Sequence, residues 1–321
     1  MSITVSINFK VLQHIPADLV DYISNNFRYP AGIIGCRATN PEMSLDCCEY
    51  DIAIFNKQSA DNRFIRLGNH GLELITLTET SRIDVMKLHN MIIIQDDDSL
   101  SLSSSSLSSA NNISAFQQQH YLRALRGLGK KSIINSLFYH EKITKNIQKN
   151  SVLAAMWLKI AAYDFLEGIL ALSEIKPMPI HELNQIRKIT IERQDIAEGV
   201  KIALECIGLE RATRSTISRS IEAICELNSM EYDKELIKIK VNHLLEKGMI
   251  SDCYYYLGRM GHRCLAYRDY KFLIKYIKLI QISMDLTKDI QQLERLHVSL
   301  VKISKIILKK LSHYHSGGNR L

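Results

Sequence analysis

The chain has 321 residues, of which 46% are hydrophobic and 23% are charged, and its formal net charge is +7. This length is sufficient for two domains with separate hydrophobic cores. No apolar run approaches the roughly 18–20 residues of a membrane span, and the N-terminus lacks a basic start followed by an apolar core. The seven cysteines form no Cys-x-x-Cys pair. We therefore expect a cytoplasmic protein with reduced thiols and no membrane association.

Charge and composition divide the chain near residue 100. Residues 1–110 contain 8 Lys and Arg against 13 Asp and Glu, a net charge of −5, whereas the remainder contains 33 against 21, a net charge of +12. A serine-rich tract of low complexity separates the two parts, as linkers often do. We predict an N-terminal domain over 1–98, a linker over 99–112 and a helical domain over 113–321.

The N-terminal part shows the short apolar runs and turn residues of a small sheet with flanking helices. The expected elements are, in chain order, a helix over 16–23, a strand ending at Ile34, a short helix through Met43, a strand over 49–55, a hairpin over 64–77 and one or two strands within 81–95. Asp96–Asp98 is expected to be a solvated turn before the linker. The predicted fold class is α+β, with a mixed sheet followed by an all-α bundle.

The C-terminal part has helical periodicity almost throughout. An apolar segment over 152–170 is expected to be the central helix of the bundle, and Pro177 and Pro179 to break the chain after it. Ser251 is favoured over Asp252 as the N-cap of its helix. Further helices are expected at 195–208, 213–228, 231–248 and 250–264, with one long helix over 268–312.

The most informative motif lies at the end of the first predicted strand and the start of the second. Glu49 and Asp51 are two residues apart in a strand, so both side chains should project from the same face. Neighbouring carboxylates repel each other unless a cation lies between them, and Mg²⁺ is the hard cation that accompanies nucleotide phosphates. The turn at Gly35-Cys36 offers backbone N–H groups, and the start of a helix, to a phosphate.

Gly35-Cys36-Arg37-Ala38, followed by Glu49-Tyr50-Asp51, resembles the signature of the nucleotidyltransferase superfamily, which includes DNA polymerase beta, kanamycin nucleotidyltransferase and the minimal nucleotidyltransferases. That signature is Gly followed by Ser or Gly, a spacer, and an acidic-x-acidic pair flanked by apolar residues. The chain departs from it at two positions. Cys36 stands where Ser is usual, and Glu49 stands where Asp is more common.

The resemblance implies a third carboxylate on a strand beside the first pair. Glu73 is favoured, because the hairpin would bring it next to the strand of Asp51. Asp84, which also has apolar neighbours, is the alternative. Arg37 either neutralises charge near the phosphates or is a structural residue paired with Glu42 or Asp46.

The activity implied by the resemblance is transfer of a nucleoside monophosphate from an NTP, expected to be ATP, to an acceptor hydroxyl or phosphate. Glu49, Asp51 and Glu73 would hold Mg²⁺ or Mn²⁺, and Gly35, Cys36 and Arg37 would bind the nucleotide phosphates. The basic helical domain would bind RNA or a phosphorylated small molecule as acceptor. The alternative is a non-catalytic regulator that binds nucleotide or nucleic acid.

Three further features of the helical part have both a functional and a structural interpretation. His181 and Glu182 either contact a substrate or start a helix exposed to water, and the second is favoured. Tyr254–Tyr256, near several arginines, is compatible with nucleic-acid contact, although at least one of the three should be buried in the core. The third feature is a lysine-rich face that either attracts phosphate or is simply solvated: Lys271, Lys275, Lys278, Lys302, Lys305, Lys309 and Lys310.

Overall fold

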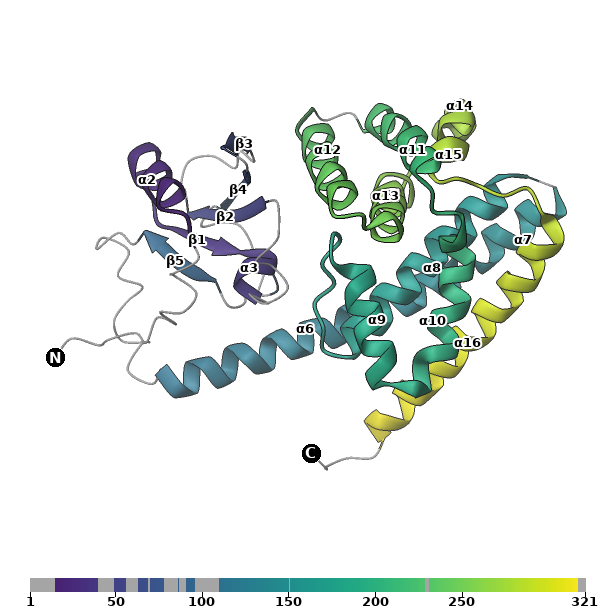
Figure 1. Ribbon diagram of the computed structural model, residues 1–321. Coiled ribbons are helices and arrows are strands. Elements are labelled where there is room, and N and C mark those ends of the chain that lie inside the picture. Colours follow the sequence, from purple (N-terminus) through teal and green to yellow (C-terminus); the bar gives the residue numbers. More distant parts are fainter. Residues whose placement is uncertain are drawn as a thin grey trace. The chain divides into compact units, whose positions relative to one another are not determined.

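The computed structural model describes residues 15–39, 49–55, 63–68, 70–77, 86, 91–95, 110–149, 151–228 and 231–316. The chain forms two compact units, Met1–Ala124 and Leu125–Leu321. The predicted class is confirmed, since a mixed sheet is followed by helices (Figure 1). The predicted linker falls largely outside the described residues, and 110–112 already belong to helix α6 (Ala110–Phe138). No helix in the described ranges is both long and apolar enough to cross a membrane.

The sheet of the first unit has five strands in the order β3-β4-β2-β1-β5. The strands β2 and β4 pair in parallel, whereas the other neighbouring pairs are antiparallel. The predicted hairpin is confirmed as β3 and β4. The bounds are β1 Ala31–Ile34, β2 Glu49–Phe55, β3 Arg63–Leu67, β4 His70–Leu77 and β5 Ile92–Gln95.

Helix α2 (Ala17–Asn26) covers one face of this sheet. Its buried residues Leu19 and Ile23 belong to a core with alternate residues of β1, β2 and β4, among them Tyr50, Ile52 and Leu74. Because successive side chains of a strand point to opposite faces, burial of these positions directs the intervening residues to the other face. Packing of the core thus determines which face of the sheet can carry a polar site.

The second unit is helical and is built around α8 (Leu153–Leu172), which is buried over nearly its whole length, as its continuous apolar sequence predicts. It packs against α7, α10 and α16. The other elements are α7 His140–Gln148, α9 Glu182–Glu192, α10 Gln194–Ile207, the 3₁₀ turn η1 Leu209–Arg211, α11 Arg214–Leu227, α12 Glu231–Glu246, α13 Ile250–Leu265, α14 Tyr270–Lys275, α15 Ile277–Ser283 and α16 Ile290–Ser316.

The long helix predicted over 268–312 is wrong, because this segment forms α14, α15 and α16. Aspartates mark the interruptions. The side chains of Asp269 and Asp289 each accept a hydrogen bond from the backbone N–H three residues later, at 2.7 and 3.0 Å, as helix-capping aspartates do. Asp285 adopts a left-handed backbone conformation, with φ of 46°, just after α15.

Buried charges of the second unit are paired across helices. Arg259 of α13 donates hydrogen bonds to Glu182 and Glu167, and its Nη1 lies 3.2 Å from Nδ1 of His262. Because arginine can only donate, this Nδ1 accepts and the imidazole Nε2–H donates to Asp164 at 2.9 Å. Burial lowers the pKa of His262, so the imidazole is neutral at pH 7.

The burial pattern corrects the expectation for Glu182 and confirms the one for the tyrosine run. Glu182 is completely buried, not exposed to water at a helix start, and accepts a hydrogen bond from the Tyr255 hydroxyl at 2.7 Å. The expectation that at least one of Tyr254–Tyr256 lies in the core is confirmed, since all three are buried, as are Arg259 and His262, and these residues offer no nucleic-acid surface. The favoured cap at Ser251 is also wrong, because α13 begins at Ile250 without a side-chain cap.

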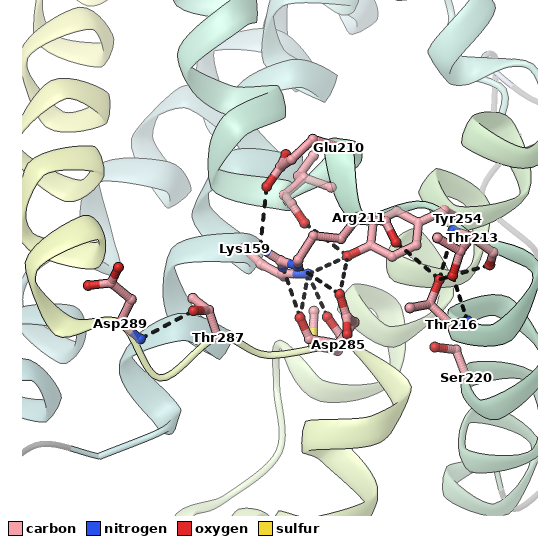
Figure 2. A network of polar contacts seen from close by, with 12 residues as sticks. Lys159, Glu210, Arg211, Thr213, Thr216, Ser220, Tyr254, Asp285, Thr287 and Asp289 are labelled. Atoms are coloured by element: carbon pink, nitrogen blue, oxygen red, sulfur yellow. Dashed lines mark hydrogen bonds and ion pairs between the residues drawn. The ribbon is translucent and has the colours of Figure 1, made fainter.

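A second polar network joins α8, η1 and α13 to the connection between α15 and α16 (Figure 2). Lys159 is buried and donates hydrogen bonds to the Tyr254 hydroxyl at 3.1 Å and to the carbonyl oxygens of Met284 and Asp285 at 2.5 and 3.2 Å. The Asp285 carboxylate accepts from Arg211 Nε at 2.8 Å and from Tyr254 at 3.0 Å. Burial and the nearby Arg211 cation lower the pKa of Lys159 to about 7.

This network predicts a pH dependence of stability. The pKa of Lys159 is about 7 in the folded chain and near the ordinary 10.5 when unfolded, so the unfolded state binds more protons between these values. The free energy of unfolding should therefore rise with pH above 7, with a contribution of up to about 1.4 kcal/mol per pH unit from this group. Denaturant titrations at pH 7–9 should show a shallower rise for Lys159→Met. If the free energy of unfolding rises equally with pH in both proteins, the pKa of Lys159 is not lowered in the folded chain.

Close helix packing gives a second prediction. A Cβ atom at Gly258 would collide with the Tyr163 hydroxyl, whereas one at Gly127 would meet nothing within 4 Å. Gly258→Ala should destabilise the protein by about 1–3 kcal/mol through overpacking. Gly127→Ala, also in a helix, should be neutral or stabilising by up to about 1 kcal/mol. Urea unfolding measures both, and equal stabilities would show that the α8–α13 contact tolerates a methyl group.

Candidate metal centre

Three carboxylates converge on the sheet face opposite α2. Asp51 of β2 and Glu73 of β4 are register partners in the parallel pair, and Glu49 precedes Asp51 by two residues on the same face. One oxygen from each of the three side chains lies within 4.8 Å of the others. The two strands therefore assemble an all-oxygen donor set of the kind that Mg²⁺ and Mn²⁺ prefer.

The three carboxylate side chains are buried or half-buried. Glu49 is 4% exposed, and its Oε2 atom is buried, as is the Oδ1 atom of Asp51, while Glu73 is half-buried. Like charges at this separation repel strongly when water is scarce around them. A divalent cation relieves this repulsion, so the donor atoms, their spacing and their burial all fit a metal ion.

The turn after β1 lies against Asp51, one of the three carboxylates. Gly35 has a left-handed backbone with φ of +74°, which glycine adopts without strain, and it begins the five-residue helix α3 (Gly35–Thr39). A Cβ atom at this position would collide with Oδ2 of Asp51. Glycine is thus needed twice, for the turn and for the close approach of the backbone to the carboxylate. The next residue, Cys36, is buried.

Arg37 contacts the start of β2. Its Nε–H donates to the carbonyl oxygen of Glu49 at 2.8 Å, and its guanidinium carbon lies 3.8 Å from the centroid of the Tyr50 ring. The His70 ring meets the same tyrosine edge-on at 5.3 Å. Arg37 is thereby held beside the backbone of the residues that carry the carboxylates.

The sequence-predicted residues can now be placed individually. Glu73, Glu49 and Asp51 lie together, and Gly35 lies against Asp51. The alternative third carboxylate, Asp84, lies outside the described residues, as do Glu42 and Asp46, the expected partners of Arg37. Sequence reasoning missed Tyr50 and His70, because aromatic residues on the core face of a strand carry no signal beyond hydrophobicity.

Comparisons with protein-family models, curated proteins and solved structures found no match for this chain.

Metal binding should be visible in the thermal stability of the protein. A ligand that binds only the folded state at 100 times its Kd stabilises it by about 2.7 kcal/mol, so Mn²⁺ should raise the melting temperature of the first unit. Asp51→Asn should abolish most of this rise, while leaving the metal-free protein equally or more stable because it removes a repelling charge.

The matched control for this prediction is Asp21→Asn, which removes the same charge from an exposed position of α2. The control should keep the full response to Mn²⁺. A metal response of equal size in the two variants, or none in the parent protein, would show that the three carboxylates form no metal site.

Proposed function

We propose that the chain is a metal-dependent nucleotidyltransferase that moves a nucleoside monophosphate from an NTP, with ATP as the expected donor, to an acceptor hydroxyl or phosphate. The observation that supports this most is the convergence of Glu49, Asp51 and Glu73 beside the Gly35 turn. This is the arrangement that the resemblance to the nucleotidyltransferase superfamily implies. The fold adds Glu73 to the two carboxylates of the motif, which is the third ligand that the resemblance implies.

Each residue of the site has a role in this proposal. Glu49, Asp51 and Glu73 would together hold Mg²⁺ or Mn²⁺ through their carboxylate oxygens. When bound, the metal ions stabilise the charge that develops on the attacking and leaving oxygens. Glu73 accepts the proton of an acceptor hydroxyl as its oxygen bonds to the α-phosphorus, and pyrophosphate leaves.

The nucleotide phosphates are bound by the turn after β1. Backbone N–H groups of Gly35 and Cys36 hold the outer phosphates, and the absence of a side chain at residue 35 lets the phosphates approach as closely as Asp51 does. Arg37, held at the start of β2, adds positive charge on this side. The helical unit, with its positive charge, binds the acceptor, either RNA or a phosphorylated small molecule.

A non-catalytic regulator that binds nucleotide or nucleic acid is the competing function. Its expected signature is a missing third carboxylate, since binding without turnover does not need the acceptor-side ligand. Glu73 lies with the pair, which favours the enzyme over the regulator.

Transfer of label from α-labelled NTPs, with Mg²⁺ or Mn²⁺ and with or without total cellular RNA, tests the proposal. The parent protein should label an acceptor fraction, and Glu49→Ala/Asp51→Ala should lower the rate by at least about 100-fold, because transition-state charge stabilisation contributes several kcal/mol. The control is Asp18→Ala/Asp21→Ala on α2. Metal and nucleotide binding without transfer to any acceptor would favour the regulator.

A further inference from the structure

The segment from Arg263 to Lys278 concentrates positive charge and aromatic rings on the outside of the second unit. It contains five Lys and Arg, four aromatic residues and a single acidic residue, Asp269. The Asp269 carboxylate caps α14 by accepting the backbone N–H of Phe272 at 2.7 Å. Figure 1 shows α14 at the periphery of the helical unit, and it packs against α15.

The aromatic residues of this segment are unusual in their exposure. Among the side chains that the structure describes, the exposed aromatic residues are Phe138, Tyr267 and Tyr270, at 69%, 81% and 64% exposure. Two of these three lie within four residues of each other.

Cations lie beside the rings of the same segment. The guanidinium carbon of Arg268 is 4.7 Å from the Phe272 centroid, and Lys275 Nζ is 4.9 Å from the Tyr276 centroid. Arg268 also donates from Nε to the carbonyl oxygen of Cys264 at 3.2 Å, which fixes its position. Among the described residues, Arg268, Lys271 and Lys275 form no ion pair, so their charges remain available to an external anion.

From this juxtaposition we infer that Tyr267, Arg268, Tyr270, Lys271 and Lys275 form a binding surface for single-stranded nucleic acid. We call these five residues the aromatic–basic surface. Exposed tyrosines stack on unpaired bases, and the interspersed cations neutralise successive phosphates, which is the combination that single-strand binding uses. This surface locates the RNA binding that the proposed function gives to the helical unit, and in that respect it rests on the proposed function, although its test below does not use the transferase activity.

The surface chemistry favours a polynucleotide over the other polyanions. A membrane-surface helix needs a broad apolar face over several turns, whereas α14 has six residues and the exposed rings are hydroxylated tyrosines. An acidic peptide would satisfy the cations but would leave two large exposed rings without a stacking partner. Only unpaired bases, which present flat faces beside phosphates, use both features together.

Fluorescence anisotropy with a labelled 20-nucleotide oligo(U) RNA and the full chain tests the inference. Tyr267→Ala/Tyr270→Ala should weaken binding about tenfold or more, because stacking contributes about 1–3 kcal/mol per base. Tyr267→Phe/Tyr270→Phe keeps the rings and should retain binding. Lys271→Gln/Lys275→Gln should reduce the slope of log K against log salt by about 1.4, since each phosphate contact contributes about 0.7 for a single strand.

The matched control is Lys302→Gln/Lys305→Gln, which removes the same charge from exposed positions of α16 and should leave the salt slope unchanged. Because all these side chains are exposed, every variant should keep the circular dichroism of the parent. Glu49→Ala/Asp51→Ala should bind RNA normally, which separates this inference from the transferase activity.

Three results would overturn the inference. One is the absence of RNA binding by the folded parent protein. The second is equal loss of affinity in both lysine variants with no effect of the tyrosine-to-alanine change, which would reduce the binding to general charge attraction. The third is equal competition by a duplex of the same length, by poly-glutamate or by phosphatidylserine vesicles, because none of these presents unpaired bases.

Discussion

The parallel pairing of β2 with β4 is the constraint on which the candidate site depends. It sets Asp51 opposite Glu73 and, through the two-residue period of β2, adds Glu49 to the same face. A shift of the β2–β4 register by one residue would turn Glu73 toward the apolar core under α2 and bring Leu72 or Leu74 to the site. The leucines on β4 oppose such a slip, because they are completely buried against α2 and β2. Packing on one face of the sheet thus holds three repelling carboxylates together on the other.

Buried charge in the helical unit is paired within the protein. Among the described residues, Glu182 is held by Arg259 and Asp252 by Arg187. Such pairs offset the cost of desolvation within the protein itself. In the sheet unit, Arg37 donates from Nε to the carbonyl oxygen of Glu49 and so lies beside the strand that carries two of the three carboxylates. A divalent cation bound there would offset the mutual repulsion of these carboxylates.

Local patterns predicted much of the sheet unit, because strand period and turn residues act over short distances. The face shared by Glu49 and Asp51 and the β3–β4 hairpin follow from such rules. The place of Glu73 beside the strand of Asp51 was predicted from the hairpin and the resemblance, but the register that sets the two residues opposite each other was not, because the β2–β4 pairing joins segments separated by another strand. In the helical unit, Glu182 was misjudged, because its burial depends on α13, a helix distant in sequence that supplies Tyr255 and Arg259 as its partners. The break between α15 and α16 was missed because Asp285 and Asp289 interrupt an otherwise uniform helical pattern.

Burial of the tyrosine run also changes where a polynucleotide can bind. Tyr254 and Tyr255 use their hydroxyl groups inside the helical core, on Asp285 and Glu182, and present no ring to solvent. The tyrosines that do so, Tyr267 and Tyr270, lie beyond the end of α13, where the capping residue Asp269 turns the chain into α14. The same aspartate is the only acidic residue in residues 263–278, against five cations, so the segment stays positive even with its carboxylate charged. By accepting the backbone N–H of Phe272, Asp269 begins α14 and fixes the short connection that carries Tyr267 and Arg268.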